Sequence, residues 1–107
     1  MPAKEDTAFG YHYHDQSEEA FYIVSGEGTL GFVEGEKAVK AGDMLCFPAG
    51  KNGAHVLSNR SGTEPLVFID FDVRASKTDI VTFPDQGGIM VRGVHTSFRT
   101  VIPDEAK

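Results

Sequence analysis

Short apolar runs rich in Phe, Tyr, Ile, Val and Thr recur along the chain between clusters of Gly, Pro, Asn and Asp. Their spacing is typical of a β-sandwich or a β-barrel. We predict strands at Phe9–His14, Ala20–Ser25, Gly28–Val33, Lys37–Ala41, Met44–Phe47, Ala54–Asn59, Leu66–Val73, Thr78–Phe83 and Ile89–Val94, with a last piece near Phe98–Ile102. No segment has helical periodicity. The pattern therefore predicts an all-β chain, in which Glu34, Gly35 and Glu36 form a hairpin turn.

The length of the chain, 107 residues, is that of one domain. A domain of this size buries roughly two-thirds of its unfolded surface without needing disulfides or a metal for support. No linker, internal repeat or low-complexity segment interrupts the pattern. We predict a single domain over residues 1–107, with a barrel core at residues 9–94 and a C-terminal tail at residues 95–107.

Charge and composition exclude several classes of partner. The net charge is -6, and the Lys and Arg residues are scattered singly, so no basic stripe can follow a phosphate backbone. No apolar stretch is long enough to span a membrane, and the N-terminus lacks the apolar core of a signal peptide. The single cysteine, Cys46, lies in an apolar run where we expect a buried, reduced thiol. We predict a cytoplasmic protein with no nucleic-acid or membrane partner.

The first group of candidate functional residues lies near the N-terminus. His12 and His14 are two apart on a predicted strand, so their side chains share one face. Glu19 has the phase of Phe21, which we expect to point inward, and its carboxylate can face the two imidazoles. A His-x-His pair alone is more often exposed or hydrogen-bonded on an edge strand than a ligand pair. By the residues alone, the neighbouring Glu18 is as ambiguous as Glu19.

The second group lies in the middle of the chain. Gly42 and Asp43 form a predicted turn, a strand follows, and His55 opens the next strand with Leu57 in its phase. A lone histidine in a strand is more often a satisfied core residue than a ligand. Together, however, the two groups supply three imidazoles and one carboxylate, the mixed nitrogen and oxygen set that divalent transition metals prefer.

In order and spacing, these two groups resemble the two motifs of the cupin family. The first motif, His-x-His followed by Glu and Gly, is matched by His12, His14, Glu19 and Gly26, and its register selects Glu19 over Glu18. The second is matched by Gly42, Pro48, Gly50, His55 and Asn59, with four residues in place of two between Gly50 and His55. A later stretch at Phe83–Gly88 is similar to one found in small single-domain cupins of the type-2 conserved-barrel kind, but it lacks their lysine.

The resemblance implies a jelly-roll-like cupin barrel, that is, a double-stranded β-helix. It also implies one divalent transition-metal ion per chain, Fe, Mn, Ni or Zn, held by His12, His14, Glu19 and His55. We expect the second ring nitrogen of each histidine to find a carbonyl, water or carboxylate partner. Four such ligands leave one or two positions open on a five- or six-coordinate ion.

The family includes dioxygenases, decarboxylases and sugar isomerases as well as binding modules, so the fold does not name the reaction. Two hypotheses follow. The first is a metal-dependent enzyme that acts on a small oxygenated metabolite as its small-molecule ligand. The second is a non-catalytic module that binds a metal or a small ligand. The sequence does not decide between them, and the catalytic residues stay unassigned.

One strand bears on that choice. The run Leu66–Val73 has an apolar face, Val67, Ile69, Phe71 and Val73, and a second face that carries Asp70 and Asp72. The favoured interpretation turns the apolar face into the barrel and leaves both aspartates in solvent. The alternative packs the apolar face against a partner copy, so that Asp70 or Asp72 points into the cavity, where it would be the only acid or base beyond the metal ligands.

We also predict a homodimer. The chain begins shortly before the first histidine strand, and the strands that usually cover that side of a cupin barrel are almost absent. An unpaired edge and an apolar outer surface would remain, which a second copy related by a two-fold axis would cover. The alternative is that the C-terminal piece, Thr96–Ile102, folds back to cap its own barrel. His95 falls outside both motifs, and we expect it at the surface.

Overall fold

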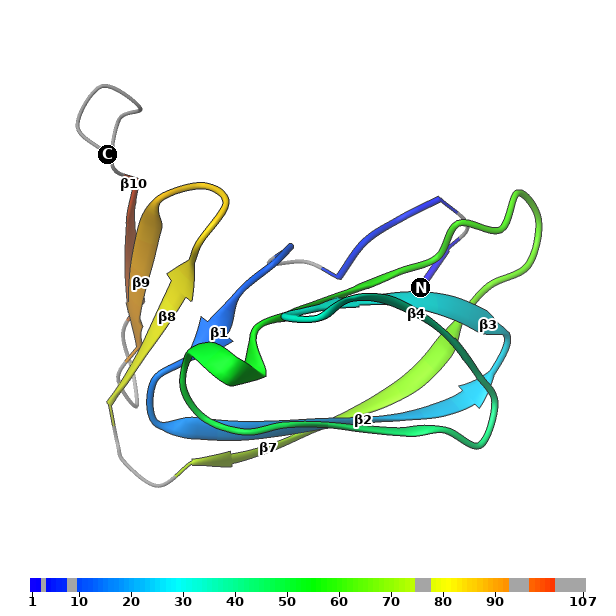
Figure 1. Cartoon of the computed structure of the whole chain (residues 1–107), viewed down its shortest axis with the longest axis horizontal. Coiled ribbons are helices and arrows are strands. Elements are labelled where there is room, and N and C mark those ends of the chain that lie inside the picture. The colour runs from blue at the N-terminus through cyan, green and yellow to red at the C-terminus, as the bar shows by residue number, and fades with distance from the viewer. Residues whose placement is uncertain (3, 8–9, 75–77, 93–96, 102–107) are drawn as a thin grey trace.

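The computed structural model describes residues 1–2, 4–7, 10–74, 78–92 and 97–101 (Figure 1). Within these residues the chain forms strands and one short 3-10 helix. The strands are β1 (Tyr13–His14), β2 (Ser17–Ser25), β3 (Glu27–Phe32), β4 (Gly35–Lys40), β5 (Met44–Phe47), β6 (His55–Ser58), β7 (Val67–Arg74), β8 (Asp79–Phe83), β9 (Gly88–Arg92) and β10 (Ser97–Val101), and the helix is η1 (Lys51–Gly53). Each predicted strand overlaps an observed one, which confirms the all-β prediction.

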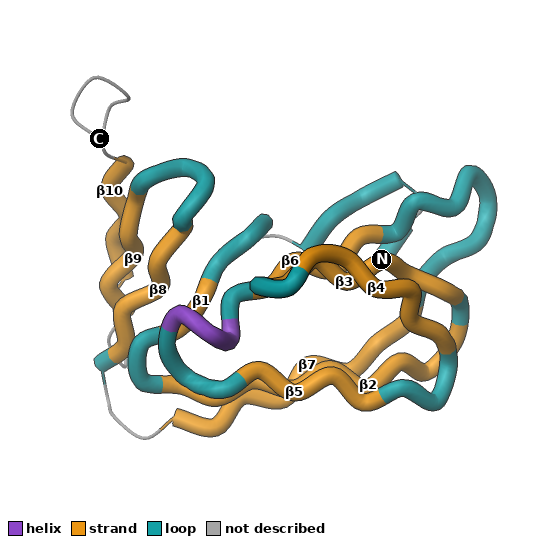
Figure 2. Tube along the Cα trace, viewed as in Figure 1, coloured by secondary structure: helices purple, strands orange, loops and turns teal. Residues whose placement is uncertain are grey.

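Two antiparallel sheets enclose the main core. Sheet β5-β2-β7 and sheet β4-β3-β6 form the two long sides of a flattened ring (Figure 2). Their inward side chains make one buried apolar cluster: Phe21, Ile23, Leu30, Val39, Phe47, Leu57 and Leu66. A third sheet, β1-β8-β9-β10, stands at one end of the ring and has a smaller core of Val81, Phe83 and Met90 (Figure 1). The residues predicted to bind a metal lie where the ring and this third sheet meet.

Strand β2 is the centre of its sheet and shows the expected alternation. Ser17, Glu19, Phe21 and Ile23 are buried, whereas Glu18 is exposed. Since alternate side chains of a strand point to opposite faces, Glu19 is carried into the barrel with the core residues. The strand ends at Ser25, and Gly26 follows with a φ of +88° at a place where a Cβ atom would collide with the carbonyl oxygen of Pro65. Only glycine fits both conditions, which explains this position of the first motif.

The edge that we expected to be open beside β6 is covered by the chain's own N-terminal segment. The amide of Thr7 donates to the carbonyl of Leu57 at 2.8 Å, and the amide of Asn59 donates to the carbonyl of Glu5 at 2.8 Å. The side-chain amide of Asn59 also donates to the carbonyl of Met1 at 3.1 Å. The prediction of an unpaired edge on this side is therefore wrong, because the extended segment satisfies the backbone groups of β6.

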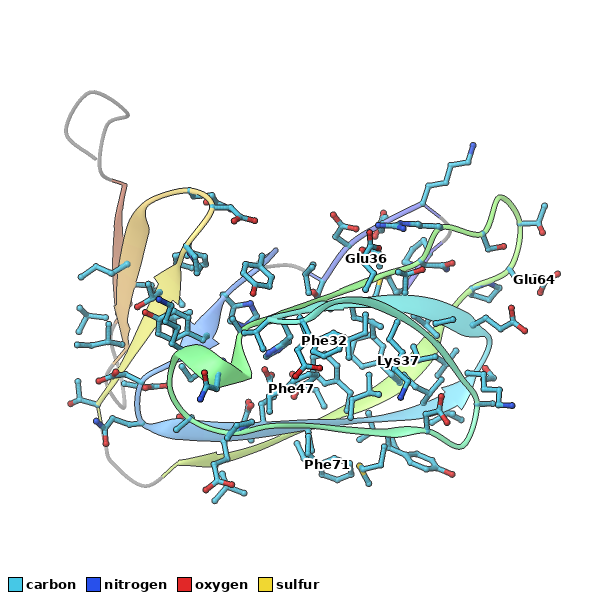
Figure 3. The ribbon with its side chains drawn as sticks, viewed as in Figure 1. Phe32, Glu36, Lys37, Phe47, Glu64 and Phe71 are labelled. Atoms are coloured by element: carbon cyan, nitrogen blue, oxygen red, sulfur yellow. The ribbon has the colours of Figure 1, made fainter. Side chains whose placement is uncertain are left out.

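Strand β7 presents its apolar face outward. Val67, Ile69, Phe71 and Val73 are between 43% and 68% exposed, and Figure 3 shows Phe71 pointing away from the space into which Phe32 and Phe47 point. The pairing with β2 explains this, because Asp70 lies opposite Phe21 and Asp72 lies opposite Glu19, and opposite residues share a face. The favoured interpretation of this strand is wrong, and the alternative orientation is confirmed.

The other two strands of the sheet β5-β2-β7 also present apolar side chains on its outer face. This face carries Tyr22, Val24 and Met44, which are exposed large apolar side chains. Cys46, which we expected to be buried, is exposed and unpaired, because Leu45 and Phe47 take the inward positions of β5. We name this surface, made of Tyr22, Val24, Met44, Cys46, Val67, Ile69, Phe71 and Val73, the outer apolar face.

The C-terminal strand belongs to the outlying sheet. Strand β10 pairs with β9, from Ser97 opposite Arg92 to Val101 opposite Gly88, and not with the two sheets of the ring. His95 lies outside the described residues. In the described part of the chain, no helix has the length and apolar character needed to cross a membrane.

Candidate metal centre

The four predicted metal-binding residues come together where the ring meets the outlying sheet. His12 precedes β1 and bridges His55 at the start of β6, with an amide-to-carbonyl hydrogen bond in each direction, at 3.1 and 2.9 Å. His14 lies in β1, and Glu19 reaches them from β2. All four are buried, with at most 8% of their surface exposed. Strands β1, β2 and β6, and the isolated β-bridge of His12, thus bring the four side chains together in one buried place.

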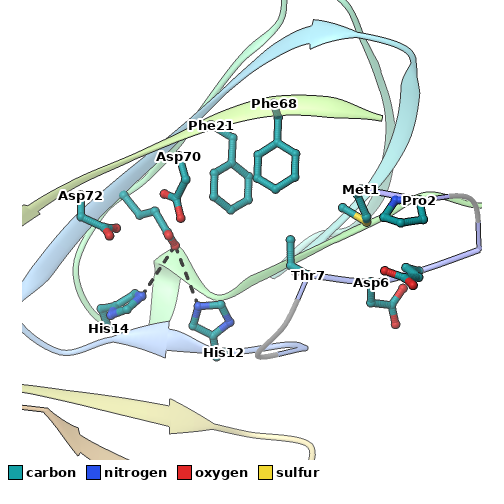
Figure 4. A pocket seen from close by; sticks show the side chains of 12 residues that line it. Met1, Pro2, Asp6, Thr7, His12, His14, Phe21, Phe68, Asp70 and Asp72 are labelled. Carbon is teal, nitrogen blue, oxygen red and sulfur yellow. Dashed lines mark ion pairs between the residues drawn. The ribbon is translucent and has the colours of Figure 1, made fainter. Parts of the chain in front are cut away.

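The ring nitrogens of the three histidines face one carboxylate oxygen. Glu19 Oε1 lies 2.8 Å from His55 Nε2, 3.6 Å from His14 Nε2 and 3.9 Å from His12 Nε2; dashed lines in Figure 4 mark the pairs of His12 and His14. Among the described residues, the buried Glu19 Oε1 and His55 Nε2 find no hydrogen-bond partner. Buried polar atoms left in this way are costly, and a cation bound among them would satisfy both. Three imidazoles and one carboxylate therefore fit a divalent transition metal.

Backbone carbonyls orient two of the histidines. His12 Nδ1 lies 2.8 Å from the carbonyl oxygen of Gly10, and His55 Nδ1 lies 2.8 Å from that of Gly53. A carbonyl can only accept, so each Nδ1 carries the proton and each Nε2 presents a lone pair to the centre. The expectation that these ring nitrogens find outer partners is confirmed, and the resulting tautomer is the one that binds a metal through Nε2.

Asp79 orients the third histidine, and the sequence analysis missed it. Its Oδ2 accepts from His14 Nδ1 at 2.9 Å and from Ser17 Oγ at 2.8 Å, and its Oδ1 accepts from the amide of Gln16 at 2.8 Å. Burial alone would raise the pKa of Asp79, but these three donors lower it below its usual value. A signal was present, because Asp79 shares the phase of Val81 in a strand whose alternate residues are buried.

The second motif has two extra residues between Gly50 and His55, and the helix η1 lies in this longer stretch. The residues that lengthen the stretch between Gly50 and His55 form this single 3-10 turn, in which the amide of Gly53 donates to the carbonyl of Gly50 at 3.0 Å. The carbonyl of Gly53 is the one that holds His55. A Cβ atom on Gly53 would collide with the carbonyl oxygen of Pro48. The longer loop therefore keeps His55 in place by close packing that only glycine allows.

Replacing Gly53 by alanine is expected to move this turn and weaken metal binding, because the new methyl group meets backbone rather than a yielding side chain. Overpacking of this kind costs about 1–3 kcal/mol of folding free energy. Urea unfolding and a metal titration check both effects. Gly62→Ala is the matched control, since a Cβ atom there has open space. Equal stability and equal metal affinity of the two variants would contradict this account of η1.

The electrostatics of the group favour the protonation states that ligation requires. Burial lowers the pKa of His12 to about 4, so its imidazole is neutral at pH 7. Burial would also raise the pKa of Glu19, but the adjoining imidazoles of His14 and His55 lower it below its usual range, so it is ionised. Burial would lower the pKa of His14, yet the carboxylates of Glu19 and Asp79 raise it. A metal must therefore compete with a proton chiefly at His14.

A cavity of about 700 Å³, lined in part by His12, His14 and Glu19, opens beside the group, and its volume is within the range of small-molecule sites. Figure 4 shows Phe21 and Phe68 on one wall with Asp70 and Asp72 next to them. Carboxylate oxygens of Glu19, Asp70 and Asp72 lie within 4.8 Å of one another. Partial burial and the adjoining Glu19 raise the pKa of Asp70 to about 7. Asp70 is thus an acid or base group exposed to the cavity beside the candidate metal-binding residues.

Three solved structures are similar to this chain. A sugar phosphate isomerase of the cupin superfamily from Silicibacter pomeroyi has a TM-score of 0.86 and 21% identity, covering 99% of this chain and 69% of that one. A putative sugar phosphate isomerase from Acidithiobacillus ferrooxidans has a TM-score of 0.75 and 33% identity, over 86% and 57%. A cupin protein from Bacteroides fragilis has a TM-score of 0.58 and 29% identity, over 71% and 61%. The chain thus spans between 57% and 69% of the length of these proteins.

A comparison with curated protein sequences finds no significant match. Residues 2–72, which include all of both motifs, match the sequence profile of the cupin domain. The similar folds confirm the predicted jelly-roll-like barrel. The chain therefore belongs to the cupin family.

Proposed function

We propose that this cupin is a metal-dependent enzyme that isomerises a small oxygenated metabolite by proton transfer. The observation that carries the proposal is the place of Asp70, whose carboxylate lines the cavity within 4.8 Å of the Glu19 carboxylate. A module that only binds a metal or ligand needs no acid or base there. The putative sugar phosphate isomerase with 33% identity supports the choice of isomerisation over oxygenation or decarboxylation.

In this proposal His12, His14, Glu19 and His55 hold one divalent ion, Fe, Mn, Ni or Zn. When bound, such an ion polarises a carbonyl or hydroxyl oxygen of the substrate and stabilises negative charge on it. The chain's part is to keep the four ligands in position. Asp79 and the carbonyls of Gly10 and Gly53 do this by fixing the three imidazole rings.

Asp70 is then the group that moves the proton. Its carboxylate takes the proton from the carbon next to the substrate carbonyl and returns it to the former carbonyl carbon, while the hydroxyl proton passes between the two oxygens. No atom is gained or lost, so the step needs no oxidant or second substrate. Phe21 and Phe68 form an apolar wall beside Asp70, which lowers the access of water to the reacting carbon.

Deuterium exchange tests the proposal without knowledge of the natural substrate. The metal-loaded full chain is incubated in heavy water with a series of aldoses and ketoses, and proton NMR follows the hydrogen on the carbon next to the carbonyl. We expect exchange at that position only when metal is present. Absence of exchange with every sugar and each of the four metals, by protein that retains its metal, would favour the non-catalytic binding module.

We also propose a cytoplasmic location. The support is Cys46, which is exposed and unpaired among the described residues. Exposed free thiols persist in reducing compartments and are oxidised elsewhere. Fractionation of cells that express the tagged full-length protein tests this, and recovery outside the cytoplasmic fraction would contradict it.

We further propose that two copies form a homodimer through the outer apolar face. The support for an interface is the run of exposed apolar side chains on β2, β5 and β7, which is larger than the isolated ones normal on a monomer. A second copy is the partner we propose because a two-fold axis needs only one self-complementary surface.

Ile69→Lys is expected to convert the dimer to a monomer, because a lysine charge would have to be buried in an apolar interface. Light scattering should give twice the chain mass of 11.6 kDa for the parent and the single mass for the variant. Val33→Lys is the control, since Val33 is similarly exposed, at 50% against 46% for Ile69, but lies outside this face. A monomeric parent at high concentration, or a dimeric Ile69→Lys variant, would rule this interface out.

A further inference from the structure

The cavity beside the candidate metal centre is strongly acidic. Five of its lining side chains are carboxylic acids: Glu5, Asp6, Glu19, Asp70 and Asp72. No lysine or arginine is among the lining residues that the structure describes. Met1 also lines the cavity, and its N-terminal ammonium donates a hydrogen bond to the carbonyl of Leu66.

None of the described lysine and arginine side chains is among the lining residues: Lys4 is exposed next to Glu5 in the chain, and Lys40 is exposed at the end of β4. Arg60 pairs with Glu36 at 2.7 Å, and Figure 3 shows Glu36 on the opposite side of the ring from Phe71 of the outer apolar face. Lys37 lines a separate cavity between β4 and β5, and Lys51 is exposed on η1. η1 has three residues and offers no helix N-terminus for an anion. The described wall thus lacks the arginine, lysine or helix end by which proteins bind phosphate.

The charge balance of this wall disfavours an anionic substrate. A divalent ion would bring two positive charges, and Glu19 would neutralise one of them as a ligand. Four carboxylic acids would still face the bound molecule, and repulsion between like charges in a partly enclosed site is little screened by salt. The same carboxylates accept hydrogen bonds from hydroxyl groups, and Phe21 and Phe68 offer contact to carbon-bound hydrogens.

We propose that the substrate of this site is a small hydroxyl-bearing carbonyl compound without a phosphate or carboxylate group, such as an unphosphorylated sugar. This inference rests on the proposed isomerase function and narrows it. The proposed substrate thus differs from the sugar phosphates that the names of two similar structures indicate. The acidic wall, and not the metal, is what discriminates against the phosphorylated sugar.

A matched set of three probes tests the inference: D-glucose, D-glucosamine and D-glucose 6-phosphate share a carbon skeleton and differ in charge. Saturation-transfer NMR with the zinc-loaded full chain at pH 7.5 gives their relative affinities. We expect glucose 6-phosphate to bind at least tenfold more weakly than glucose, and glucosamine to bind no more weakly than glucose. The discrimination should persist when salt is raised to about 0.15 M, because charges in a partly enclosed site are little screened.

Variants test whether the acidic side chains of the cavity cause the discrimination against glucose 6-phosphate. Asp72→Asn combined with Asp6→Asn is expected to reduce the discrimination against glucose 6-phosphate at least threefold. Glu34→Gln, at the exposed turn between β3 and β4, is the control with the same kind of substitution and should leave the ratio unchanged. Circular dichroism and zinc content establish that each variant is folded and loaded.

The outcomes separate the two claims. Binding of glucose 6-phosphate as tight as that of glucose, or tighter, overturns the inference and leaves the isomerase proposal standing. An unchanged ratio in the double variant also overturns it, because the wall would then not be the cause. If none of the three probes binds and no sugar exchanges its proton, the proposed function falls, and this inference falls with it.

Discussion

Replacing both His12 and His55 by alanine is expected to remove the bound metal, from about one ion per chain in the parent to less than about a tenth. Loss of a single outer hydrogen-bond partner of a metal ligand already costs roughly 10–100-fold in affinity. Removing two proposed metal ligands, including His55, whose Nε2 lies 2.8 Å from Glu19 Oε1, should lower the metal affinity far more. Elemental analysis of the purified proteins measures the effect.

His95→Ala is the control for that double variant. His95 is the remaining histidine of the chain and belongs to neither motif, so its loss should leave the metal content unchanged. Circular dichroism is needed alongside, because His55 is buried against Phe47, with ring centroids 3.6 Å apart, and its removal can weaken the core. A folded double variant with the metal content of the parent would show that the ion lies elsewhere.

Replacing Asp70 by asparagine is expected to lower kcat by roughly 100- to 10,000-fold, the range lost when a general base is removed. The metal content should stay near that of the parent, since Asp70 is not one of the four proposed ligands. KM should change much less than kcat, because asparagine keeps the size and polarity of the side chain. Steady-state kinetics with any sugar that exchanges its proton in heavy water gives both constants.

Asp85→Asn serves as the control, since Asp85 is an exposed aspartate in the turn between β8 and β9. If Asp70→Asn retains the kcat of the parent while Asp72→Asn does not, the base is Asp72, the other aspartate of the cavity wall. If both variants match the parent in metal affinity, folding and activity, neither aspartate moves the proton, and the case for catalysis rests on the metal alone.

The strands and the clustering of the candidate metal-binding residues were predictable because they depend on local alternation. A period of two places Glu19, rather than Glu18, on the face of Phe21, and the structure buries the first and exposes the second. The same rule brings His12 and His14 to one side. Motif spacing then ties this segment to His55, more than 35 residues later in the chain, which alternation alone cannot do.

Strand β7 shows where local reasoning fails. Its apolar face is the more hydrophobic one, so burial by hydrophobicity predicts that it points inward. The pairing register with β2 decides otherwise, because Asp70 lies opposite Phe21. Long-range pairing also hid Asp79, which meets His14 across 65 positions of sequence, and the N-terminal segment, which has no strand pattern of its own but satisfies the edge of β6.

Anomalous diffraction from crystals of the purified protein, at the absorption edge of the metal found by elemental analysis, tests the central claim most directly. We expect one peak per chain, bonded to Nε2 of His12, His14 and His55 at about 2.0–2.2 Å and to a carboxylate oxygen of Glu19 at about 2.0–2.2 Å. At least one further position should be taken by water or a small molecule. A strong peak elsewhere, or none among these four residues in protein that contains metal, would contradict the account.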